Sequence, residues 1–112
     1  MTAPHLSRRL TLEERQRAPD GAGGFSETWV PLGDLWAELK AGSGGERRGE
    51  AVTLSTASYR ITVRAAPQGA PSRPKPDQRF RDGTRVFRIL AVSDGHPKGR
   101  FLTCHAREEV TG

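Results

Sequence analysis

Cysteine is nearly absent from the 112-residue sequence, which contains only Cys104. One cysteine cannot form a disulfide within the chain, and no cluster of cysteine and histidine has the spacing of a zinc site. Long apolar runs are also absent. No stretch approaches the ~20 residues of a membrane span, and the N-terminus lacks the apolar segment of a signal peptide. We therefore expect a soluble, intracellular protein with no membrane partner, metal or cofactor.

Apolar side chains are scarce as well. Hydrophobic residues make up 34% of the sequence and aromatic residues 6%, whereas there are 13 glycines and 8 prolines. A short chain of this composition can bury one modest core. We predict a single domain over residues 1–112, with a flexible N-terminus at residues 1–7 and long loops.

Lysine is rare among the basic residues. Of 18 lysines and arginines only three are lysine (Lys40, Lys75 and Lys98), and the formal net charge is +5. Arginine suits bidentate contacts to carboxylate or phosphate, so binding to nucleic acid is compatible with this composition. The basic residues are dispersed and partly matched by acids, however, which favours a solvated basic surface.

Alternation of apolar and polar residues is the main pattern that is present, and it predicts about six or seven short β-strands. The candidate strands cover Arg9–Arg15, Phe25–Val30, Gly33–Ala41, Ala57–Ala65, Arg79–Arg81, Thr84–Ser93 and Arg100–Arg107. Pro31 is expected to separate the second of these strands from the third. The run VFRILAV, within the sixth, should be buried on much of both faces.

The connections between these candidates carry turn and loop signals. Residues 18–24 (APDGAGG) predict a turn, and the glycine-rich segment 42–58 predicts a long mobile loop. The connection 66–78 has four prolines and should be extended, with a possible role as a docking arm. Asp82-Gly83 lies between two alternating runs and predicts a hairpin. The pattern as a whole is typical of a mainly β fold, a small antiparallel β-barrel or sandwich.

Catalytic chemistry finds little support in the sequence. Cys104 and His105 could form a nucleophile pair, but adjacent residues of a strand point to opposite faces, so we expect Cys104 to be a small buried residue. Gly42, Gly44 and Gly45 lack the Lys-Ser/Thr that closes a phosphate-binding loop. We predict no catalytic residues and no enzyme activity.

Two tryptophans and two loop arginines are the remaining candidates for a site. Trp29 and Trp36 could stack on nucleobases, but aromatics are sparse, and packing in the core or at an interface is the favoured use. Arg47 and Arg48 lie in the glycine-rich segment. They either face DNA phosphates or are solvated loop residues, and the sequence leaves both interpretations open.

The order of the segments resembles the phage head–tail joining family, also called head closure or stopper proteins, and its relatives in gene transfer agents. The resemblance covers roughly residues 8–109, although the proline-rich stretch 67–76 has more prolines than the family pattern. The matching segments are LTL at 10–12, DGAGGFSETWV at 20–30, LWAEL at 35–39, GER at 45–47, YRITVR at 59–64, RDGTRVFRI at 81–89 and FLTC at 101–104.

The resemblance implies a structural function. Proteins of this kind form a homo-oligomeric ring in the neck of the particle, between the portal or adaptor ring and the tail terminator or other tail proteins. They extend the channel for double-stranded DNA and can close it after packaging. The loop 42–58, with Arg47 and Arg48, would face this channel. Assembly would take place in the bacterial cytoplasm. The alternative is a small β-barrel module that binds nucleic acid by itself.

Overall fold

The computed structural model describes residues 4–42, 57–95 and 97–109, and these residues form a mainly β fold, as predicted. Besides one 3₁₀ turn, η2 (Pro97–Gly99), no helix occurs in these ranges. None of the described residues forms a helix that could cross a membrane. The strands are β1 (Arg8–Pro19), β2 (Phe25–Ala41), β3 (Ala57–Arg64), β4 (Arg79–Asp82), β5 (Arg85–Ser93) and β6 (Phe101–Glu109).

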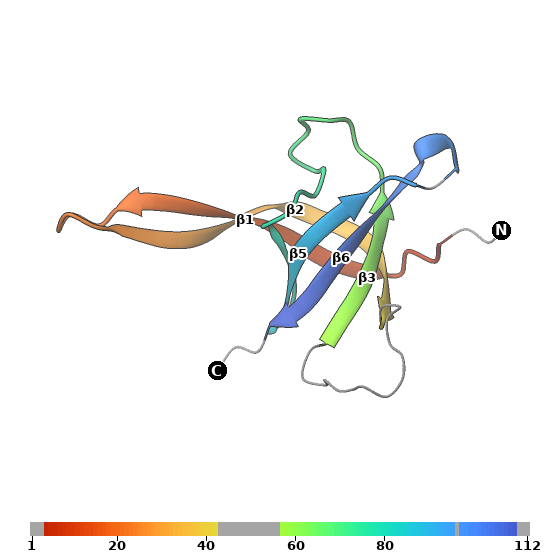
Figure 1. Cartoon of the computed structure of the whole chain (residues 1–112), viewed down its shortest axis with the longest axis horizontal. Helices are drawn as coiled ribbons and strands as arrows, with labels where there is room; N and C mark the ends of the chain where they lie inside the picture. The colour runs from red at the N-terminus through yellow and green to blue at the C-terminus, as the bar shows by residue number, and fades with distance from the viewer. Residues whose placement is uncertain (1–3, 43–56, 96, 110–112) are drawn as a thin grey trace.

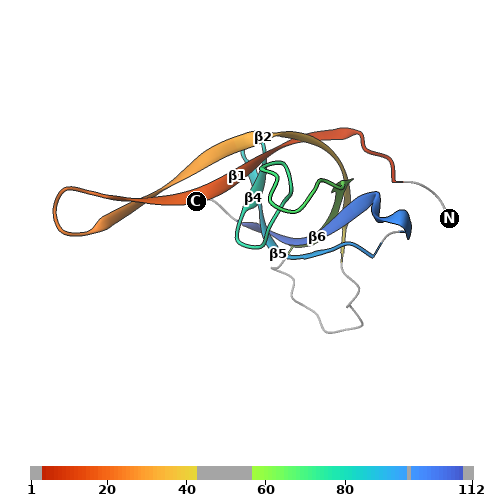
Figure 2. The ribbon, with the colours of Figure 1, turned by 90° about the horizontal axis from the view of Figure 1, so that it is seen from above.

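The six strands form one antiparallel sheet that closes into a barrel in the order β1-β2-β3-β6-β5-β4 (Figures 1 and 2). Strand β1 closes it, because it pairs with β2 along its length and with β4 through Thr11, Leu12 and Glu13. The prediction of a small antiparallel barrel or sandwich is therefore confirmed, and the strand order is that of a closed barrel. Closure leaves no exposed sheet edge where β1 is paired on both sides.

Side chains that alternate along the strands fill the barrel. Leu10 and Leu12 of β1 and Ile61 and Val63 of β3 are fully or almost fully buried, as the period of two requires. Phe87 of β5 is also fully buried, and the ring of Tyr59 meets it edge-on at a centroid distance of 5.1 Å and an angle of 82°. The other buried core residues are Ala37, Phe80, Val86, Ile89, Leu102, Cys104 and Ala106.

Pro31 does not end a strand, so the predicted division of residues 25–41 is wrong. Strand β2 runs without a break, and the register with β1 shifts by one residue where Leu12 pairs with Gly33 and Glu13 pairs with Pro31. Proline is tolerated at bulges and on edge strands, and Pro31 meets both conditions because β3 pairs only with residues 37–41 of β2.

The prediction for β5 is only partly right. Val86 and Phe87 are adjacent and both buried, so the strand is covered on both faces there. Beyond Ile89 the register with β6 shifts, and Leu90 is left 52% exposed. A bulge places the extra residue outside the regular alternation, which explains why an apolar side chain faces outward.

The proline-rich connection 66–78 is folded into successive turns and is not extended. The amides of Ala70 and Arg73 donate to carbonyl oxygens three residues earlier, and Pro74 is fully buried against the barrel. The hairpin between β4 and β5 is confirmed. Its two turn residues are Gly83 and Thr84, because Asp82 still pairs with Arg85, and the positive φ of 63° suits Gly83.

A two-stranded arm extends from the barrel (Figures 1 and 2). It comprises residues 14–30, where β1 and β2 pair with each other and with no other described strand. The molecule is therefore elongated, with principal extents of 53 × 37 × 22 Å. An isolated two-stranded ribbon is marginally stable in water, so the arm depends on contacts at its base and on any partner that it meets.

Candidate functional site

The base of the arm is held by a buried carboxylate. Glu13 is only 3% exposed, and its two carboxylate oxygens accept hydrogen bonds from the Nε atoms of Arg79 (2.7 Å) and Arg81 (2.8 Å). Burial raises the pKa of Glu13, but the hydrogen bonds and charges of Arg81 and Arg79 outweigh burial, so this pKa lies below its ordinary value of 4.5. Glu13 is thus ionised at neutral pH and joins β1 to β4.

Trp29 lies beside this network, where three guanidinium groups surround its ring. Arg79 is the nearest, 4.2 Å from the ring centroid, followed by Arg88 at 5.7 Å and Arg15 at 5.9 Å. Such cation–π contacts stabilise partly desolvated cations. The indole is half-buried at the junction of arm and barrel. In the structure, Trp29 packs at this junction. Its use at an interface with a partner stays a prediction.

The tip of the arm is a turn fixed by hydrogen bonds, and an exposed aromatic ring follows it. The Asp20 carboxylate accepts hydrogen bonds from the amides of Ala22 (2.8 Å) and Gly24 (3.0 Å), and these bonds lower the pKa of Asp20. Phe25 follows directly and is 61% exposed, with the Arg17 guanidinium 4.8 Å from its ring centroid. The arm therefore ends in an ordered apolar knob flanked by charge.

Trp36, the second predicted interface residue, lies on the barrel and is 56% exposed. It borders an open groove of about 530 Å³, mostly apolar, which Leu6, Asp34, Leu35 and Arg64 also line. Hydrogen bonds from Thr11 and Arg9 lower the pKa of Asp34, so a carboxylate stands at the groove. An exposed tryptophan beside a groove is typical of an anchor for a partner.

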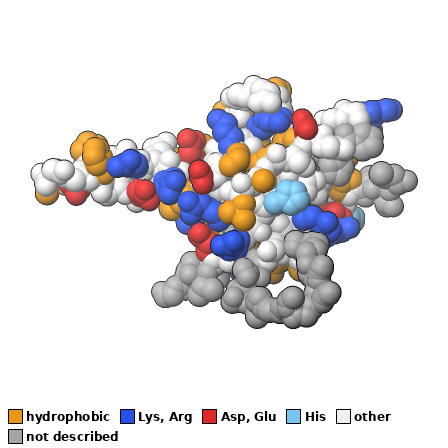
Figure 3. All heavy atoms as spheres, in the orientation of Figure 1, with side chains coloured by type: hydrophobic (Ala, Val, Ile, Leu, Met, Phe, Trp, Pro, Cys, Tyr) orange, Lys and Arg blue, Asp and Glu red, His pale blue; other side chains and the backbone are white. Residues whose placement is uncertain are grey.

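A row of basic residues crosses the outer face of three neighbouring strands. Lys40 of β2 pairs with Arg60 of β3, which pairs with His105 of β6, and Arg107 follows two residues later on the same exposed face. Among the described residues no carboxylate forms an ion pair with Arg60 or Arg107, and Lys40 has only Glu38 at 4.0 Å. Figure 3 shows basic side chains beside a histidine on this face.

This basic row lies next to the ends of the glycine-rich segment. The amide of Gly42 donates to the carbonyl of Ser58 at 2.7 Å, two residues from Lys40 and Arg60. Arg47 and Arg48 lie outside the described residues, so their predicted role in facing DNA stays a prediction. The row itself was missed in the sequence, because only the pairing register brings Lys40, Arg60 and His105 side by side.

Cys104 and His105 diverge, as predicted from their adjacency on a strand. Cys104 is fully buried, and this burial raises the pKa of its thiol to about 12, which disfavours the thiolate. His105 points to the exposed outer face. Among the described residues no group of three or more His, Cys, Asp or Glu side chains is close enough to hold a metal ion.

The comparisons with known proteins agree with one another. A family model described as phage head completion protein matches residues 1–109. No curated protein matches the chain. A chain from the virion of a native gene transfer agent particle is 55% identical, with a TM-score of 0.79, over 98% of this chain and 100% of that chain.

A second solved structure, protein SF1141 from Shigella flexneri 2a, supports the fold alone. It is 22% identical, with a TM-score of 0.71, over 100% of both chains. The family match spans all described residues, including the arm, the barrel and the basic row. The chain therefore belongs to the family of phage head completion proteins.

Proposed function

We propose that this protein is a connector subunit that forms a ring between the portal–adaptor complex and the tail of a phage or phage-like particle. The ring extends the DNA channel and gates it after packaging. Membership in a family of structural virion proteins supports this role, as does the 55% identity to a chain from a gene transfer agent virion. In this role the protein acts by assembly and not by catalysis.

The observation that carries the proposal is the basic row of Lys40, Arg60, His105 and Arg107. Lys40 and Arg60 carry like charges directly opposite each other on neighbouring strands, which is destabilising, and no described carboxylate forms an ion pair with Arg60 or Arg107. An anionic partner outside the chain would offset this cost. DNA phosphate is such a partner, and repetition around a ring turns one row into a band of positive charge.

The position of the row fits a channel wall. It lies beside Gly42 and Ser58, the described ends of the segment that carries Arg47 and Arg48. In the proposed ring, both this segment and the row face the DNA. The arm of residues 14–30 extends from the barrel and is free to contact neighbouring subunits.

The proposal is tested in particles whose subunits carry Arg60→Glu together with Arg107→Glu. We expect these subunits to be incorporated normally but the nuclease-protected DNA per particle, or its delivery, to fall at least tenfold. The matched control is Lys75→Glu with Lys98→Glu, which changes the charge equally at exposed positions away from the row. Normal DNA retention and delivery in the Arg60/Arg107 variant would refute the channel assignment.

The alternative function, a module that binds nucleic acid by itself, predicts a different behaviour of the free chain. A salt titration with labelled duplex DNA distinguishes the two. A connector subunit binds weakly until a ring brings many rows together, whereas an independent module binds at micromolar concentration or tighter. Tight, salt-sensitive binding by the monomer would favour the alternative.

A further inference from the structure

Two large exposed hydrophobic side chains lie on surfaces of opposite shape, one on a protruding tip and the other beside a groove. Phe25 is 61% exposed at the tip of the arm, and Trp36 is 56% exposed beside the groove on the barrel. Both are on β2, eleven residues apart along one extended strand. At about 3.3 Å per residue they are roughly 35 Å apart, so the tip cannot reach the groove of its own chain.

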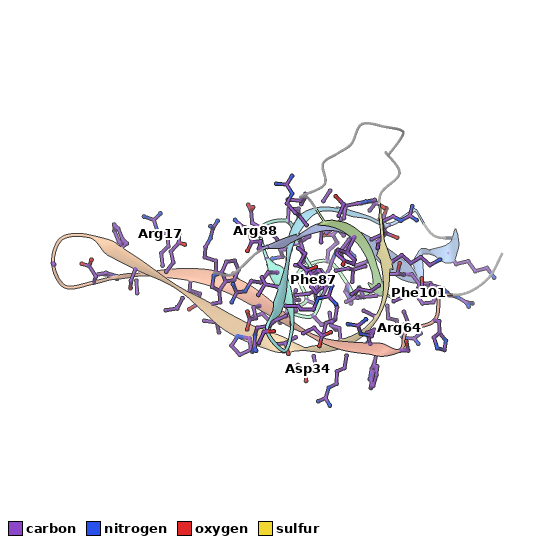
Figure 4. The ribbon with its side chains drawn as sticks, turned by 90° about the horizontal axis from the view of Figure 1, so that it is seen from below. Arg17, Asp34, Arg64, Phe87, Arg88 and Phe101 are labelled. Carbon is purple, nitrogen blue, oxygen red and sulfur yellow. The ribbon has the colours of Figure 1, made fainter. Side chains whose placement is uncertain are left out.

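We propose that the tip of the arm, with Phe25 as its anchor, docks in the groove beside Trp36 of a second copy of this chain. This inference rests on the proposed ring, and it names the contact between neighbouring subunits. Figure 4 shows Arg17 along the arm and Arg64 of the groove on the opposite side of the barrel. A knob and a groove at different ends of a molecule make a heterologous contact, which closes into a ring when the rotation permits.

Charge at the two surfaces is complementary, which favours a second copy over an unrelated partner. Arg17 stacks on Phe25, and Glu27 is its cross-strand neighbour. The groove offers the opposite pair, with the Asp34 carboxylate, which already forms an ion pair with Arg9 at 2.9 Å, and the Arg64 guanidinium among its lining groups. Docking therefore brings Arg17 toward Asp34 and Glu27 toward Arg64 while the apolar rings meet between them.

The knob is also ordered before it binds. The two amide hydrogen bonds to Asp20 fix the turn, and Arg17 covers one side of the Phe25 ring. A preorganised element loses less conformational entropy on docking than a flexible loop. The groove is open and mostly apolar, with Leu6 and the exposed Trp36 among its lining residues.

Cysteine pairing in assembled particles tests the contact. Subunits with both Phe25→Cys and Trp36→Cys, treated with a mild oxidant, should give a ladder of linked copies on a non-reducing gel. Phe25→Cys alone should give none. The native Cys104 does not interfere, because it is buried and its thiol is protonated at neutral pH. The matched control pairs Phe25→Cys with Leu90→Cys, since Leu90 is also exposed but lies outside the groove.

The outcomes separate this contact from the ring itself. An amine-reactive cross-linker acts through Lys40, Lys75 and Lys98 and reports neighbouring copies whose lysines lie within its reach, whether or not Phe25 and Trp36 are in contact. A lysine ladder without a Phe25–Trp36 cysteine ladder would overturn the contact and leave the ring standing. Absence of both ladders would overturn the contact as well. Cross-linked dimers from Phe25→Cys alone, or links to another virion protein, would also overturn the proposed docking.

A charge exchange gives an independent readout in case the cysteine variants assemble poorly. Arg17→Glu should lower incorporation of the subunit into particles at least fivefold. Adding Asp34→Arg should restore most of the loss, because the opposite charges face each other again in the exchanged order. A lack of rescue, with both variants folded by circular dichroism, would contradict the contact between Arg17 and Asp34.

Discussion

The barrel and the arm share strands β1 and β2 but are stabilised in different ways. Among the described residues, the fully buried aliphatic and aromatic side chains all lie in barrel strands, whereas no residue from 14 to 30 is buried. The barrel holds together by removing apolar surface from water. The arm relies on its own strand pairing, on the turn at Asp20 and on the Glu13 network at its base. One hairpin thus continues from a core element into an element suited to contacts with partners.

Thiol reactivity gives the largest expected difference between the two regions. A maleimide should label the native Cys104 at least 10³-fold more slowly than a cysteine introduced by Phe25→Cys, because Cys104 is fully buried in the barrel and must become exposed by unfolding before it reacts. Burial also raises the pKa of this thiol to about 12. Rates measured by mass spectrometry at pH 7.5 test this. Comparable rates at the two positions would mean that the barrel opens locally.

Truncation of an aromatic residue should affect the two regions unequally. Phe87→Ala should lower the free energy of unfolding by about 3–5 kcal/mol, since the ring is fully buried against Tyr59. Phe25→Ala at the tip should change it by less than about 0.5 kcal/mol. Urea denaturation of both variants checks the comparison. Equal losses would show that the arm contributes to the stability of the isolated chain as much as the core does.

Removing the charge of Glu13, at the junction between arm and barrel, should lower the free energy of unfolding by a smaller amount that depends on pH. Glu13→Gln should cost about 1–3 kcal/mol at neutral pH, because two arginines lose a buried carboxylate. The pKa of Glu13 in the folded state lies below its ordinary value of 4.5. The stabilisation by its ionised carboxylate is therefore complete above the pKa of Glu13 in the unfolded chain, and it is lost as pH falls through the lower pKa of the folded state.

Urea denaturation of wild type and Glu13→Gln between pH 2 and 7 measures this dependence. The two stability curves should differ by a constant amount at neutral pH and converge in acid. Glu27→Gln, at an exposed position on the arm, is the control and should follow wild type throughout. A constant difference down to the lowest pH would exclude ionised Glu13 as the cause.

Removing a charge from the basic row should change the stability of the isolated chain least, and should increase it. Arg60→Thr should raise the stability of the isolated chain by a few tenths of a kcal/mol, because it removes a cation between Lys40 and His105 and introduces a good β-former. The gain should shrink in 0.5 M salt. Thermal denaturation measures it. A clear loss of stability would mean that Arg60 has a stabilising partner.

Strand positions and the inward-facing residues followed from alternation alone. Ile61 and Val63 are buried and Tyr59 packs against the same core, as the pattern of β3 predicts, and the Asp82-Gly83 signal located the hairpin to within one residue. The errors within the strands fall where bulges interrupt the period of two. Pro31 and Leu90 both lie beside a register shift, and the local pattern does not contain the partner strand that defines a bulge.

The candidate surfaces were harder to predict because they depend on residues far apart in the sequence. Trp36 was singled out as an interface residue, but its groove also needs Leu6 and Arg64. The alternating pattern of a single segment does not indicate that β1 and β2 continue beyond the barrel. The length of the arm follows from where β4 and β3 stop pairing with them.

By itself the sequence determined a small antiparallel β protein with one core, no disulfide and a head–tail joining resemblance, because period, turn residues and composition are local properties. Only the tertiary structure decided which strands close the barrel, where the arm leaves it, and that Lys40, Arg60 and His105 form one row. These features depend on register, which is set by pairing between distant strands and by the packing of a shared core.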